Sequence, residues 1–142
     1  ANLSGAFLSN TKLNNIQVAN TKLTGANLYR ADLINANLAG AFLNNADMRE
    51  AKFNDANLSG ANLNGANLRG ANLSGANLRD ADLNGNDLRN ANLENADLSG
   101  ASLYRADLSN TNLNGVSAIN LRRCPVNLPT GWACENNSLI QR

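Results

Sequence analysis

The residues of this 142-residue chain that could do chemistry are few, and their types exclude most catalytic schemes. No His is present, which removes imidazole from acid–base catalysis and from metal binding. Asp80-Ala81-Asp82 imitates the start of a calcium-binding loop, but Ala91 stands at the twelfth position, where that loop needs a bidentate Glu. Gly60 and Gly65 have the spacing of a phosphate-binding loop without the Lys that must follow. We therefore expect no enzyme activity, no metal and no cofactor.

Two cysteines carry the remaining covalent chemistry. Cys124 and Cys134 are ten residues apart and form no CxxC redox motif, and the absence of His argues against a zinc site. We expect a disulfide, which contributes roughly 3 kcal/mol by closing a short loop. A disulfide indicates an oxidising compartment such as a thylakoid lumen or a periplasm, whereas two reduced cysteines would indicate the cytoplasm. No apolar stretch approaches the roughly 18 residues that span a membrane.

Three arginines have a regular spacing. Arg49, Arg69 and Arg89 follow one another at intervals of 20 residues. The 12 Lys and Arg residues against 11 Asp and Glu give a net charge of +1, which argues against a nucleic-acid binder held by phosphate contacts. Whether the three arginines lie together depends on the elements that position them.

A five-residue repeat organises most of the chain. Every fifth residue from Leu3 to Ala118 is apolar, and 20 of these 24 positions hold Leu. The residue two places before each is usually small, with Ala at 18 positions. Two places after each Leu stands mostly Gly or Asn, and no insertion or deletion breaks the phase. The repeat is therefore the unit from which the fold is built.

Neither an α-helix nor a regular strand suits this period. Five residues rotate a helix by about 500°, so the Leu side chains would spread over all its faces. In a short extended piece, however, Ala and Leu two residues apart face the same way. Gly and Asn then turn the chain, because both tolerate a positive φ. A chain that turns every five residues forms a solenoid, with coils about 4.8 Å apart around a narrow core of Leu and Ala.

The runs Ala61-Asn62-Leu63-Asn64-Gly65 and Ala66-Asn67-Leu68-Arg69-Gly70 resemble the A(D/N)LXX motif of pentapeptide-repeat proteins. The resemblance covers residues 1–118 and recurs in register throughout them. It implies an all-β fold, a right-handed quadrilateral β-helix with four pentapeptides per coil, and hence about six coils over this length. Such proteins are abundant in cyanobacteria and occur in plant plastids, which agrees with a lumenal or periplasmic location.

With 20 residues per coil, the three arginines stack in one column, and the aromatic residue 20 places before them lies below them. Asp47 and Asp87 each precede an arginine by two residues and should offset the repulsion within the column. The column is either a charge-balanced, solvated face or a docking strip for an acidic protein partner. The candidate interaction face comprises Tyr29, Arg49, Arg69 and Arg89.

A few residues depart from the repeat. Phe7, Phe42 and Tyr104 fall at outward positions on different faces, so we expect them to be exposed without forming a large patch. Asn86 takes an inward Ala position, where its amide should bond to backbone groups of a turn.

The segment 119–142 leaves the repeat and holds both Pro residues and the only Trp. We divide the chain into a β-helix at 1–118 and a C-terminal cap at 119–142, because a solenoid needs its open end covered. Within this otherwise irregular cap, 135–141 is expected to form a short helix. The residues expected to pack on the last coil are Leu121, Val126, Leu128 and Trp132.

The opposite end is expected to differ. Ala1 begins inside a repeat, so the first coil is expected to be uncapped. We therefore expect a monomer, or a weak end-to-end dimer through that coil.

The sequence favours a non-catalytic structural or protein-interaction module, without identifying the protein partner. The alternative is a member of the family branch that mimics DNA and binds the topoisomerase DNA gyrase. That mimicry requires a strongly negative surface along the rod, which the net charge of +1 disfavours.

Overall fold

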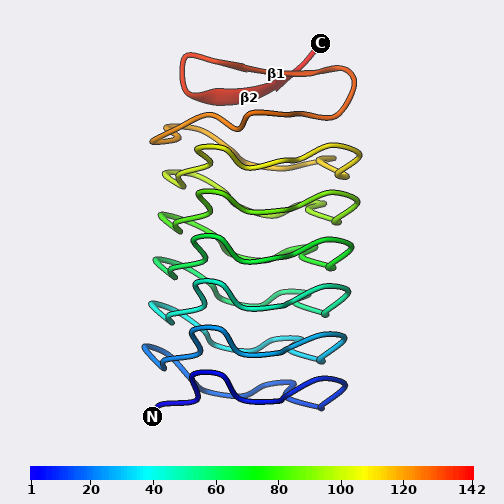
Figure 1. Cartoon of the computed structure of the whole chain (residues 1–142). Coiled ribbons are helices and arrows are strands. Elements are labelled where there is room, and N and C mark those ends of the chain that lie inside the picture. The colour runs from blue at the N-terminus through cyan, green and yellow to red at the C-terminus, as the bar shows by residue number, and fades with distance from the viewer.

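The computed structural model describes residues 1–142, which form a stack of similar coils with the two termini at opposite ends (Figure 1). From Asn2–Lys22 to Asp97–Ser117, isolated parallel bridges join residues that are 20 positions apart. Each coil therefore contains four pentapeptides. The fold is a β-helix without any α-helix, and no segment is a helix that could cross a membrane.

Hydrogen bonds between coils satisfy most backbone groups of the repeat. In one regular unit, the N–H groups of Leu63 and Gly65 donate to carbonyls of the following coil, at 2.8 and 2.9 Å. The N–H of Asn62 donates to the carbonyl of Ala41 in the preceding coil, at 2.9 Å. The N–H of Ala66 closes the turn by donating to the carbonyl of Leu63, at 3.0 Å. Stacking is therefore what makes the short extended pieces stable.

The Asn or Asp at the second position of the repeat satisfies the one N–H that stacking leaves free. The Oδ1 of Asn62 accepts the N–H of Asn64 at 3.0 Å, and Asp87 accepts that of Arg89 at 3.1 Å. These bonds hold the start of each turn. Asn and Asp are interchangeable for this purpose, so the charge at the second position is free to vary.

The fifth position of the repeat has a positive φ. Gly or Asn fills it in most units, but Arg30, Glu50 and Arg105 adopt φ values of 55°, 58° and 59° there. A left-handed conformation costs an ordinary residue about 1–2 kcal/mol. Side chains of a charged type at this position therefore carry a conformational cost that a glycine would avoid.

The core is a continuous column of inward Leu and Ala side chains, and from Leu23 to Leu113 nearly all are fully buried. Asn86 is also buried, as expected, and its Nδ2 donates to the carbonyl of Leu63 at 2.7 Å. Its Oδ1 has no partner. Phe7, Phe42 and Tyr104 are exposed, as expected.

The C-terminal segment ends in a β-hairpin, so the expectation of a helix at 135–141 was wrong. Strand β1 (Trp132–Glu135) pairs antiparallel with β2 (Ser138–Gln141). Asn136 and Asn137 connect the strands with φ values of 48° and 57°. Two consecutive residues of positive φ form the type I′ turn that suits the twist of a hairpin, and Asn is favoured in it.

The remainder of this segment continues the stack beyond Ala118. Ser102 bridges to Arg123, and Asp107 bridges to Asn127. Leu121 is buried on the last coil, and Leu128 and Trp132 pack partly buried against the core, as expected. Val126 is 64% exposed, so its expected packing was wrong; Leu139 of β2 is buried on the core instead. The antiparallel hairpin brings Leu139 to the core, a placement that a helix would not have predicted.

Candidate functional site

The structure stacks Tyr29, Arg49, Arg69 and Arg89 on successive coils; we call these four residues the arginine column. Stacking follows from the backbone, because the carbonyl of each arginine accepts an N–H from the coil before it, at 3.0 Å in each case. The side chains point outward because each residue directly follows an inward Leu or Met of the repeat.

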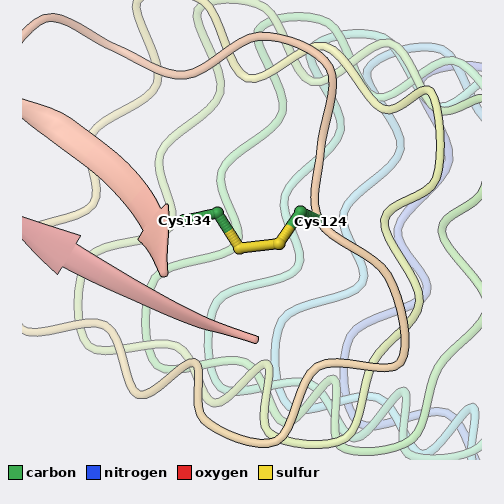
Figure 2. The surroundings of a disulfide bond; sticks show 2 residues. All are labelled: Cys124 and Cys134. Carbon is green, nitrogen blue, oxygen red and sulfur yellow. A yellow bond between two sulfur atoms is a disulfide. The ribbon is translucent and has the colours of Figure 1, made fainter. Parts of the chain in front are cut away.

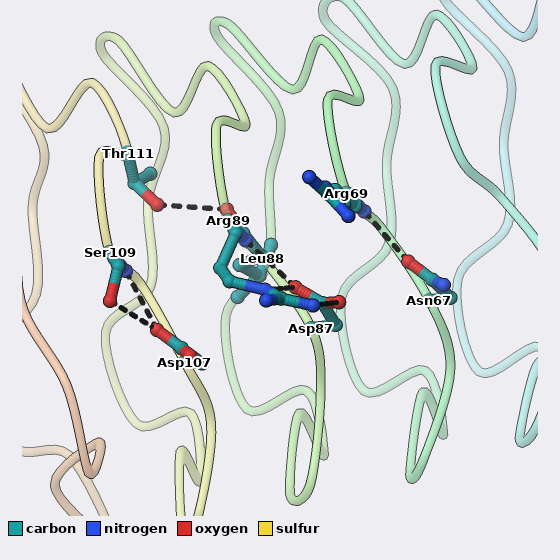
Figure 3. A network of polar contacts seen from close by, with 8 residues as sticks. All are labelled: Asn67, Arg69, Asp87, Leu88, Arg89, Asp107, Ser109 and Thr111. Atoms are coloured by element: carbon teal, nitrogen blue, oxygen red, sulfur yellow. Dashed lines mark hydrogen bonds and ion pairs between the residues drawn. The ribbon is translucent and has the colours of Figure 1, made fainter.

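Two arginines of the column are neutralised by an aspartate of their own coil. The guanidinium of Arg49 donates to both carboxylate oxygens of Asp47, at 2.8 and 2.7 Å. Arg89 binds Asp87 in the same way, at 2.9 and 2.7 Å (Figure 3). The hydrogen bonds from the arginines lower the pKa of both aspartates and raise the pKa of both guanidinium groups. Both pairs are therefore fully ionised at neutral pH.

Arg69 lies between these two pairs and has no ion pair of its own. Asn67 takes the place that Asp47 and Asp87 hold in the neighbouring coils, and its Oδ1 accepts the backbone N–H of Arg69 at 3.0 Å. In Figure 3 the guanidinium of Arg69 points away from Asn67. It is the one arginine of the column whose charge no neighbouring carboxylate neutralises.

Tyr29 forms the lower end of the column and lies against two cations. The Cζ atoms of Arg30 and Arg49 are 5.0 and 5.2 Å from the centre of its ring. The Nε of Arg30 also donates to Glu50 at 2.6 Å, across adjacent coils. Both arginines therefore combine a cation–π contact with an ion pair, which restricts the movement of their side chains.

These residues border a shallow groove of about 380 Å³. The groove begins at Tyr29 and follows the column across four coils. Gly70 has no side chain to fill it, and the unpaired Arg69 lies at its middle. The groove is lined by Tyr29, Arg49, Glu50, Arg69, Gly70 and Asn90.

The groove offers binding chemistry. Its arginines present guanidinium donors, which suit planar oxyanions, and Tyr29 adds an aromatic surface. No group of three or more His, Cys, Asp or Glu side chains lies close enough to hold a metal ion. The carboxylates at the groove are each bound to an arginine, which holds them ionised and unable to act as general acids.

A second cluster of an aromatic residue and two arginines was missed by sequence reasoning. The Cζ atoms of Arg105 and Arg123 lie 5.1 and 5.5 Å from the ring centre of Tyr104, and neither arginine has an ion pair. A sequence signal existed, because Tyr-Arg-Ala-Asp-Leu begins at both Tyr29 and Tyr104. The contribution of Arg123 had no such signal, since it bridges to a residue 21 positions earlier instead of 20.

A disulfide and an arginine fasten the C-terminal segment. Cys124 and Cys134 are bonded at an S–S distance of 2.04 Å, which ties the chain after the last full coil to β1 (Figure 2). Arg122 donates to the carbonyls of Gly100 and Asp80 at 2.9 and 3.0 Å. The end of the stack is thereby attached to two earlier coils.

Comparison with known proteins supports this description. The sequence profile of pentapeptide repeats matches eight copies, in overlapping segments that together cover residues 1–115. The chain is 27% identical to HetL, a pentapeptide repeat protein involved in heterocyst differentiation regulation in the cyanobacterium Nostoc sp. strain PCC 7120; the TM-score is 0.55, and the match covers 96% of this chain and 77% of HetL.

Two further solved structures are less similar in shape. Rfr23 from the cyanobacterium Cyanothece 51142 is 28% identical with a TM-score of 0.49, covering 83% of this chain and 87% of Rfr23. The thylakoid-lumen protein AT2G44920 of Arabidopsis thaliana is 26% identical with a TM-score of 0.40, covering 77% and 69%. No curated protein matches the chain at a significant level.

Proposed function

Because the chain belongs to the pentapeptide-repeat family, we propose that it is a non-catalytic protein-interaction module that docks a protein partner on the arginine column. A filled β-helix has no enclosed pocket in which a substrate would be kept from water. Its regular exterior, by contrast, presents side chains at fixed intervals along a rigid axis.

The observation that carries this proposal is the ordering of charged side chains at the column. Guanidinium groups held by bidentate pairs and by an aromatic ring lose little further freedom when a partner binds. Arg30 and Glu50 pair across coils even though both occupy left-handed positions that glycine would fill at lower cost. A face that served solubility alone would not require this arrangement.

We place the protein in an oxidising compartment, a thylakoid lumen or a periplasm. The support is the disulfide between Cys124 and Cys134, since reducing conditions in the cytoplasm would open such a bond. Thiol titration of unreduced, denatured protein from the source cells should find no free thiol.

The function is tested by affinity capture from an extract of the source organism. The wild-type protein and an Arg49→Ser/Arg69→Ser/Arg89→Ser variant are used side by side. We expect one protein to be captured by the wild type and lost with the variant, because the variant removes the cations of the docking face.

The matched control is Lys52→Ser/Arg105→Ser/Arg123→Ser. It removes the same number of positive charges from outside the column, at residues that form no ion pair. It should capture the same partner as the wild type. Thermal unfolding of both variants must first show that they fold. Capture by all three proteins alike would contradict docking on the column, and so would the absence of any partner.

A further inference from the structure

We infer that the groove over Arg69 binds a single carboxylate of an extended, acidic segment of a partner protein, with Arg69 as the anchor. The inference rests on the proposed docking function and adds the chemistry of the partner. It follows from three features of the groove: where its unpaired charge lies, what surrounds that charge, and the length of the groove.

The unpaired positive charge of the face is located at Arg69. The face holds four arginines and three carboxylates, and each carboxylate is bound to one arginine. The remaining guanidinium, that of Arg69, has all its side-chain donors free, because Asn67 bonds only to the backbone. The three bound pairs are Arg30–Glu50, Arg49–Asp47 and Arg89–Asp87.

The same protein shows which ligand this arginine accepts. In the coils on either side, Arg49 and Arg89 each hold a carboxylate through two hydrogen bonds. Arg69 has the same backbone position and the same place in the stack, but its coil supplies an amide. A carboxylate from another chain would complete the row with the bidentate geometry that its neighbours already use.

The surroundings favour one carboxylate over a polyanion. Asp47, Glu50 and Asp87 lie on the same face and stay ionised at neutral pH. They would repel a phosphate chain or a nucleic-acid backbone, whose charges follow one another closely. One carboxylate on an otherwise neutral segment balances the face and meets no such repulsion.

The length of the groove fits an extended peptide. Its lining runs from Tyr29 to Asn90, across three coil spacings, or about 14 Å, which is the length of about four extended residues. Side chains on one side of an extended peptide recur at about 6.8 Å, whereas the coils recur at about 4.8 Å. A peptide along the column therefore cannot place successive acids over successive coils, so one acid serves as the anchor.

The groups beside Arg69 suit the rest of such a segment. Gly70 leaves room for the peptide backbone, because the groove has no side chain there. Asn90 lines the groove one coil further on and offers an amide to a peptide N–H or carbonyl. Tyr29 closes the lower end with the aromatic ring that Arg30 and Arg49 hold in place.

The test is a titration of the whole protein with capped hexaglutamate, followed by NMR of the arginine Nε–Hε groups. We expect the Arg69 signal to shift saturably, with smaller shifts at Arg49 and Arg89. Asn67→Asp supplies an internal carboxylate to Arg69 while keeping the bond to its backbone N–H. It should weaken hexaglutamate binding about tenfold, since it removes a charge-assisted bidentate contact.

Asn62→Asp is the matched control. It makes the same substitution at the same position of the repeat, on another face, where Asn64 replaces the arginine. It should bind hexaglutamate as the wild type does. Equal binding by Asn67→Asp and wild type would overturn the inference. So would the absence of any shift at Arg69, or tighter binding of inorganic hexaphosphate than of hexaglutamate at this groove.

The two proposals fail in different ways. A partner captured by the wild type, lost with the triple arginine variant and kept by Asn67→Asp would leave the docking function intact and overturn the role of Arg69. Loss of that partner with Asn67→Asp, but not with Asn62→Asp, supports both.

Discussion

At the scale of the residue, the abundance of Asn has a physical explanation. Of the 142 residues 29 are Asn, and two positions of the repeat use them. At the second position, Asn accepts a backbone N–H through its side chain, as Asn62 does. At the fifth position, Asn adopts a positive φ, as Asn90 does at 61°. Asp performs the first task equally well, so charge on the surface is decided independently of the fold.

The paired aspartates predict how stability depends on pH. Hydrogen bonds from Arg49 and Arg89 lower the pKa of Asp47 and Asp87 below their unfolded value of about 3.9. Their stabilisation is present above the unfolded pKa and is lost as the pH falls through the lower, folded pKa. Melting temperatures measured from pH 7 to pH 2 should fall in acid, and fall less in Asp47→Asn/Asp87→Asn. Parallel curves for the two proteins would rule out this contribution.

The buried Asn86 predicts a stabilising substitution. Its Oδ1 has no partner, and an unsatisfied buried polar group costs about 1–3 kcal/mol. In Asn86→Ala the carbonyl of Leu63 would keep its bond from the N–H of Ala66, so nothing else is orphaned. We expect the free energy of unfolding in urea to rise by about 1 kcal/mol. The reverse change one coil earlier, Ala66→Asn, should lower it; a lower stability of Asn86→Ala would show that the amide is favourable overall.

At the scale of the element, the pentapeptide is stable only through its neighbours. Each unit bonds to the coil before and the coil after, so no unit has a complete set of partners alone. The end of the stack is the exception, because there the chain must supply a different element. The hairpin of β1 and β2 meets this need: its edge and Leu139 cover the last coil, and Cys134 of β1 is bonded to the preceding segment.

Removing the disulfide should therefore loosen this end. In Cys124→Ser/Cys134→Ser we expect the free energy of unfolding to fall by about 3 kcal/mol, because the bond closes a loop of ten residues. Dithiothreitol should lower the melting temperature of the wild type and leave that of the variant unchanged. Equal stability of the two oxidised proteins would mean that Arg122 and the hairpin hold the cap without the bond.

At the scale of the whole molecule, the two ends of the stack differ in the 142-residue chain. The last coil is covered, whereas Leu3 is 37% exposed and Leu8 and Leu13 are only partly buried. Four other residues of the first coil, Phe7, Lys12 and Gln17 among them, have hydrogen-bonding groups that face no further coil. This end combines apolar side chains with an open backbone edge, which is the combination that pairs with another chain.

We propose that two copies of this 142-residue chain associate weakly through the first coil, related by a two-fold axis. Sedimentation velocity over a range of concentrations should show a monomer that becomes a dimer at high concentration. Leu3→Glu/Leu8→Glu places charges on the contact and should keep the protein monomeric, whereas Arg105→Ser, at the other end, should not. A monomer at every concentration would contradict this contact.

The sequence by itself determined the regular part of the molecule. An unbroken period of five residues fixes which side chains face inward, because every unit meets the same surroundings in every coil, and the 20-residue coil then stacks the arginine column. The pairing of Cys124 with Cys134 also followed from the sequence, since no other thiol is available.

Only the tertiary structure decided what happens where the period stops and where side chains choose between partners. Residues 135–141 became a strand of a hairpin because Asn136 and Asn137 turn the chain, and Arg123 reached Tyr104 through a bridge one residue out of phase. The sequence showed Asn67 beside Arg69, but the free charge became evident only once the guanidinium groups were placed. The physical reason is range: a repeat repeats its contacts, whereas caps and ion pairs depend on groups brought together once.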